Sequence, residues 1–123
     1  MIEGIFRLSE SIRYVAVYKN GELESKSKSN TLGASGSESD RYEELLVNPA
    51  LLKLASQRGN IDCGGLEYVL VRYGNFFQFV TPTDWGHVSV CIEAYADPIQ
   101  VGAGVMSLVH QSVPQSQLSR GMG

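Results

Sequence analysis

The chain has 123 residues, of which 43% are hydrophobic and 19% charged, with 10 basic and 13 acidic side chains. This length is typical of one domain and is sufficient for a hydrophobic core without disulfide or metal cross-links. The formal net charge of −3 argues against a protein that binds nucleic acids or anionic membranes through electrostatics.

The sequence also carries signals of cellular location. Its first nine residues contain neither the basic n-region nor the apolar h-region of a secretory signal peptide. The longest apolar runs are strand-length, far short of the ~20 residues that span a bilayer. Two cysteines, Cys63 and Cys91, are too few for a disulfide scaffold and lack the spaced pairs of a zinc site. We therefore expect a cytoplasmic protein with two reduced thiols.

A short helix and a buried strand are predicted at the start of the chain. The apolar residues Ile2, Ile5 and Phe6 share one helical face and predict two helical turns within residues 1–9. So short a helix is marginal alone and must pack on another element. β-Branched and aromatic residues over 12–18 predict a buried strand.

A hairpin is predicted next. Asn20 and Gly21 both tolerate the positive φ of a type I′ turn, which is the strongest short hairpin signal. The charged residues 22–29 are expected to return as a solvent-facing edge strand. The serine- and glycine-rich residues 30–39 are expected to form a flexible loop, and they lack the lysine of a phosphate-binding loop.

The middle of the chain is predicted to be helical. Asp40, with Glu43 three residues later, has the form of a capping box and predicts a helix start. Asn48 and Pro49 predict that a second segment is capped there, giving two short helices or one kinked helix. Gly59 is expected to end it. The apolar helical face comprises Leu45, Leu46, Leu51, Leu52, Leu54 and Ala55.

Three strands are predicted in the second half. They cover residues 65–73, 76–80 and 87–94, with turns at 74–75 and 81–86. The last strand alternates, so its apolar residues face one side of the sheet and its polar residues the other.

The polar side of that last strand carries His87, Ser89 and Cys91. His87 and Cys91 are four residues apart, roughly 13 Å along a strand, which is too far to share a metal or to form a nucleophile pair. We interpret this side as a polar sheet face beneath a helix or solvent.

A closing helix is predicted after Asp97 and Pro98, which supply a capping acid and a first-turn proline. Its glycines suggest close packing on a neighbouring element. The predicted packed face comprises Ile99, Gly102, Val105, Met106 and Val109. Residues 113–123 have too little apolar surface to stay ordered, so we expect a disordered tail.

The order of elements, α-β-β-α-β-β-β-α, resembles the roadblock/LC7 family within the profilin-like group of folds. The resemblance covers about residues 1–111 and rests on the Asn20-Gly21 hairpin, the Gly86-His-Val-Ser-Val90 strand and the Ala96-Asp97-Pro98 helix start. It implies an α+β domain over residues 1–112, built on a single five-stranded antiparallel sheet of order 2-1-5-4-3. A short first helix and a long serine-rich loop depart from the family pattern, and longin or PAS-like domains are alternative related folds.

The resemblance also implies self-association. In that sheet order, residues 66–73 form an edge that is apolar on both faces and would aggregate unless covered. Family members pair this strand and the preceding helix across a two-fold axis, so we expect a homodimer that Leu70→Glu would break. The expected interface residues are Leu66, Tyr68, Leu70, Arg72, Leu51, Leu54 and Ala55.

No catalytic motif supports an enzyme, since HExxH, GxSxG and GxGxxG patterns are absent. Glu43 and Glu44 point about 100° apart on a helix, and we interpret them as a solvated face and not as an acid–base pair. No catalytic, cofactor-binding or metal-binding residue is assigned. The resemblance implies a regulatory or scaffolding protein that binds a protein partner such as a small GTPase.

Two other functions are open from the residues. A small-molecule sensor would use an aromatic-lined pocket near Tyr14, Phe77, Phe79 and Trp85. A thiol-dependent enzyme would use one of the two cysteines as its nucleophile.

Overall fold

The computed structural model describes residues 1–28 and 37–110, so most of the predicted loop over 30–39 and the predicted tail over 113–123 lie outside the described residues. The elements in chain order are α1 (Ile2–Phe6), β1 (Ile12–Lys19), β2 (Glu22–Ser27), α2 (Ser37–Tyr42), the π-helix η1 (Glu43–Val47), α3 (Asn48–Asp62), β3 (Val69–Arg72), β4 (Phe76–Thr83), β5 (Gly86–Glu93) and α4 (Pro98–His110).

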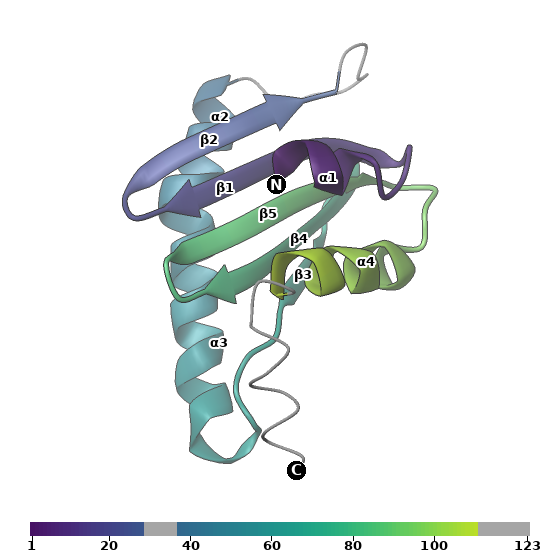
Figure 1. Cartoon of the computed structure of the whole chain (residues 1–123). Coiled ribbons are helices and arrows are strands. Elements are labelled where there is room, and N and C mark those ends of the chain that lie inside the picture. The colour runs from purple at the N-terminus through teal and green to yellow at the C-terminus, as the bar shows by residue number, and fades with distance from the viewer. Residues whose placement is uncertain (29–36, 111–123) are drawn as a thin grey trace.

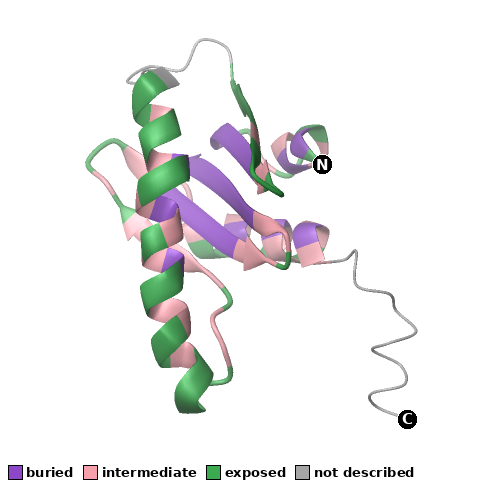
Figure 2. Ribbon diagram, turned by 90° about the vertical axis from the view of Figure 1, so that its left-hand side faces the viewer, coloured by how far each residue is buried: buried purple, intermediate pink, exposed green. Residues whose placement is uncertain are grey.

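The five strands form one antiparallel sheet in the order β2-β1-β5-β4-β3, as Figure 1 shows. The predicted α+β class and strand order are confirmed. Helices α1 and α4 cover one face of the sheet, and α2, η1 and α3 run as one long helix across the other (Figure 2). We call residues 37–62 the long helix.

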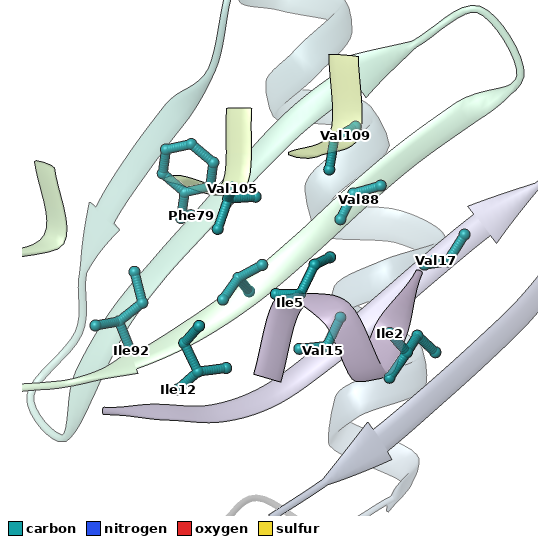
Figure 3. Close-up of a cluster of buried hydrophobic side chains, with 11 residues drawn as sticks. Ile2, Ile5, Ile12, Val15, Val17, Phe79, Val88, Ile92, Val105 and Val109 are labelled. Carbon is teal, nitrogen blue, oxygen red and sulfur yellow. The ribbon is translucent and has the colours of Figure 1, made fainter. Parts of the chain in front are cut away.

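The main apolar core lies between the sheet and the helices α1 and α4 (Figure 3). Ile2 and Ile5 of α1 insert into it, which is why a helix of five residues is stable here. The buried core residues are Ile2, Ile5, Ile12, Val15, Val17, Phe79, Val88, Val90, Ile92, Val105 and Val109.

Local signals at both ends of the domain are confirmed. Asn20 and Gly21 adopt φ values of 52° and 86°, as a type I′ turn requires. The Asp97 carboxylate accepts hydrogen bonds from the backbone N–H groups of Ile99 and Gln100, at 3.0 and 3.3 Å.

Ile99 is 55% exposed, so its predicted place on the packed face of α4 is wrong.

Two predicted strand boundaries are wrong. β4 continues through Pro82 to Thr83, so the turn into β5 is much shorter than the predicted residues 81–86. Only residues 69–72 of the predicted strand over 65–73 pair with β4. Thr81 Oγ1 donates to the carbonyl of Glu67 at 2.8 Å, which ties the preceding segment to the sheet without extending the strand.

The predicted limits of the long helix are also wrong. It is already helical at Ser37, so Asp40 lies inside it and caps nothing. At the other end it passes Gly59 and continues to Asp62. Two glycines just after its end, Gly64 and Gly65, lie in the left-handed region, with φ of 86° and 89°.

Of the two arrangements predicted near Pro49, two short helices or one kinked helix, the structure has a single continuous helix with a π-helical segment before the proline. Asn48 has helical backbone angles, φ −62° and ψ −45°, so it does not cap the start of a second helix. Its N–H binds the carbonyl of Glu43, five residues earlier. Pro49 has no N–H to offer the carbonyl of Leu45, and the wider π turn accommodates that missing bond without ending the helix.

Candidate functional site

The long helix turns polar residues toward the sheet. Its buried residues are Glu44, Asn48 and Leu52, spaced by four positions, and Glu44 and Asn48 have no exposed surface. Of the six residues in the predicted apolar face, Leu52 alone is buried. The helix therefore presents most of its apolar side chains away from the core.

Large apolar side chains are exposed along the whole length of this helix. Leu46, Leu54 and Ile61 are 58%, 67% and 75% exposed. Single exposed apolar residues are normal on monomeric proteins, whereas contiguous apolar patches are typical of interaction sites. We call this set the outer face; it comprises Tyr42, Leu45, Leu46, Leu54 and Ile61.

The edge strand β3 lies beside this helix. β3 pairs only with β4, so its second edge is unpaired within the described residues. Tyr73, just after β3, donates through its hydroxyl to Glu43 of η1 at 3.2 Å. Before β3, the backbone of Gly65 passes close to Gly59 of α3: a Cβ added to Gly59 would lie 3.3 Å from the carbonyl carbon of Gly65. The strand edge and the long helix are thus joined at both ends.

The structure places the expected interface residues on these two elements and on the segment just before β3. Leu54 and Arg72 are exposed, and the other five are partly buried. Tyr68 and Leu70 pack against the main core, with the Tyr68 and Phe79 ring centroids 4.7 Å apart. Leu70 is therefore a core contact as well as an edge residue.

A buried carboxylate joins the long helix to the sheet. Glu44 Oε1 accepts from His87 Nε2 at 2.8 Å and from Asn48 Nδ2 at 3.0 Å. Glu44 Oε2 accepts from Ser89 Oγ at 2.8 Å. The expectation that Glu44 lies on a solvated face is wrong, because three donors satisfy its carboxylate inside the protein.

The hydrogen-bonded chain continues across the sheet. Gln78 Nε2 donates to Ser89 Oγ, and Cys91 Sγ donates to Gln78 Oε1 at 3.0 Å. We call Glu44, Asn48, Gln78, His87, Ser89 and Cys91 the polar latch. Its serine and histidine both bind the carboxylate and its thiol binds an amide, so it has the connectivity of a structural network and not of a nucleophile–base pair.

Burial shifts the pKa values of the titratable groups in and around the latch. Burial, followed by the charge of Glu44, raises the pKa of Asp40 and of the Cys91 thiol. Burial is also the main cause of the raised pKa of Glu43, which the hydrogen bond from Tyr73 partly offsets. A protonated thiol is a poor nucleophile, so the site does not activate Cys91.

The four aromatic residues of the expected ligand pocket do not converge. Tyr14 lies on the sheet face beneath the long helix, in a small cluster with Ala16 and Cys91. Phe79 is buried in the main core on the opposite face of the sheet, and Phe77 and Trp85 pack against that core. The sheet separates Tyr14 from the other three.

Surface depressions lie elsewhere. One of about 550 Å³ opens between the long helix and the β3–β4 turn, beside the outer face. It is lined by Glu38, Ser39, Tyr42, Glu43, Val47, Tyr73 and Phe76. A second, of about 540 Å³, adjoins α4 on the other side of the sheet and includes Leu8 and Tyr95.

Comparison of the sequence with models of known families and with curated proteins found no match. Across residues 1–28 and 37–110, no helix combines the length and apolarity needed to cross a membrane.

Proposed function

We propose that this protein is a homodimeric platform that self-associates through the outer face of the long helix and the open edge of β3. The observation that carries the proposal is the orientation of that helix, which turns polar Glu44 and Asn48 toward the sheet and leaves apolar Leu46, Leu54 and Ile61 exposed. Burying apolar surface is the main driving force of association, and each of these side chains has that surface available.

A second copy of the chain is the occupant that fits both parts of this surface. An unpaired antiparallel edge offers alternating N–H and C=O groups that match an identical edge across a two-fold axis. The sheet would then run continuously through both copies and leave neither β3 edge open. The helices beside the edges would cover each other's apolar side chains.

The opposite side of each copy would remain available for a protein partner. Leu8, Tyr95 and Ile99 are exposed there, and Leu8 and Tyr95 border the depression beside α4. A small GTPase is the partner class that the resemblance to the roadblock family implies. The proposed role is regulatory and non-enzymatic.

The test is a charge placed on the outer face. We expect Leu54→Glu to lower the solution mass, measured by light scattering, from about twice 13.4 kDa to 13.4 kDa. Ile99→Glu is the matched control, because Ile99 is an exposed apolar helical residue on the opposite layer. Leu70→Glu is less informative, since Leu70 also packs on the core. A Leu54→Glu variant that keeps the doubled mass contradicts the proposal.

A further inference from the structure

The two faces of the sheet are packed by different chemistry. The face under α1 and α4 holds the apolar core of eleven buried residues. The face under the long helix holds a buried apolar cluster of only Tyr14, Ala16 and Cys91, and the helix itself contributes one buried apolar side chain, Leu52. Strand alternation adds Val80 to this face.

Polar groups fill the rest of that interface. Hydrogen bonds within the latch replace bonds to water that the same groups make when exposed, so their net gain is small. Burial of apolar surface stabilises the folded state in proportion to the buried area, and the face under the long helix buries little apolar area. Regions with few buried apolar contacts open at lower free energy than the whole domain.

The geometry of the latch makes such an opening all-or-none. Glu44 receives donors from its own helix, through Asn48, and from β5, through His87 and Ser89. Lifting the helix breaks both contacts to β5 together and returns the carboxylate to water. Gly64 and Gly65, both at positive φ, lie between α3 and β3 and give the chain a place to bend.

We infer that the long helix is a separately opening layer, held on the sheet by the polar latch, while the sheet with α1 and α4 stays folded. Opening uncovers Cys91 and carries the outer face away from the β3 edge. The consequence for self-association rests on the proposed function, but the opening itself does not.

The chain carries its own reporter of this motion. Cys91 is buried beneath the long helix and Cys63 is exposed, so Cys63→Ser leaves one thiol that reacts only when the helix layer opens. The rate at which the Cys91 thiol of the folded protein reacts with a disulfide reagent, divided by the rate for the urea-unfolded chain at the same pH, gives the equilibrium constant for opening. Fluorescence of the single tryptophan, Trp85, gives the global unfolding constant.

The matched control is a thiol one residue away on the other face of the same strand. Val90 is fully buried in the main core, so Val90→Cys in a Cys63→Ser, Cys91→Ser background reports on that layer. We expect the Cys91 opening constant to exceed the global unfolding constant at least tenfold, and the introduced thiol to follow global unfolding. Equal constants for both thiols would overturn the inference.

Weakening the latch gives the second arm. Glu44→Gln should raise the Cys91 opening constant at least tenfold relative to the variant's own global unfolding constant, with no such change for the thiol introduced at Val90. Ser89→Ala, which removes one donor, serves if Glu44→Gln does not fold. A parallel rise at both thiols would show that Glu44 acts on the whole domain. Both ratios can be measured in the dimeric protein and in Leu54→Glu, so failure here and failure of self-association are distinguishable.

Discussion

Alanine at Gly102 tests how closely α4 is packed on the sheet. A Cβ at Gly102 would lie 2.5 Å from Phe79 Cε2 and 3.0 Å from Phe79 Cδ2. Phe79 is buried in the core, and its ring centroid lies 4.7 Å from that of Tyr68 with the two rings tilted by 31°, so the ring has little room to shift. Overpacking of this kind costs about 1–3 kcal/mol.

Gly104 of the same helix is the matched control. The nearest atom to its Cβ would be in the Leu8 side chain at 3.6 Å, an ordinary contact. Alanine favours a helix interior over glycine by about 1 kcal/mol, and both variants receive that gain. Gly104→Ala should therefore gain up to ~1 kcal/mol, while Gly102→Ala should be about 1–3 kcal/mol less stable than Gly104→Ala.

Urea unfolding followed by Trp85 fluorescence gives both free energies, at one protein concentration because association shifts apparent stability. The transition midpoints should separate while the slopes stay equal. If Gly102→Ala stabilises the protein as much as Gly104→Ala, the close approach of α4 to Phe79 is wrong.

Two further predictions concern a cap and a carboxyl. Asp97→Ala should lower the free energy of unfolding by about 1 kcal/mol, because the N–H groups of Ile99 and Gln100 lose their acceptor; an unchanged urea midpoint would contradict that role. Glu43→Gln should be more stable than the wild type at neutral pH. Because the pKa of Glu43 is raised in the folded protein, protonation of this carboxyl stabilises the fold; that stabilisation is full below the usual pKa of 4.5 and is lost as the pH rises through the raised value. Glutamine stays neutral at every pH and therefore does not lose it. Urea titrations should show that this gain disappears near pH ~3, where the wild-type carboxyl is also protonated; a gain of equal size at both pH values would show that the charge is not its cause.

The sequence was most informative where the determinant is local. Asn20 and Gly21 define their turn by their own tolerance of positive φ, and Asp97 caps the helix that follows it. The alternation of β5 correctly placed Val88 and Val90 on the core face, because sheet geometry leaves only two sides. The strand order is non-local and came only from the resemblance of the element order to a known family.

The latch could not be predicted in the same way. Glu44 follows Glu43 in a helical segment, and adjacent acids are normally solvated. Its partners His87 and Ser89 are more than 40 residues away, so no short-range spacing signals the contact. The same contact sets which side of the helix faces the sheet, and the leucine pattern alone does not specify that choice.

The most direct test of self-association is the solution mass of the wild-type chain over a dilution series, measured by size-exclusion chromatography with light scattering. For the proposed dimer we expect a mass near twice 13.4 kDa that persists on dilution. A mass of 13.4 kDa at every concentration would contradict it, and would mean that the outer face and the β3 edge do not bring two copies together.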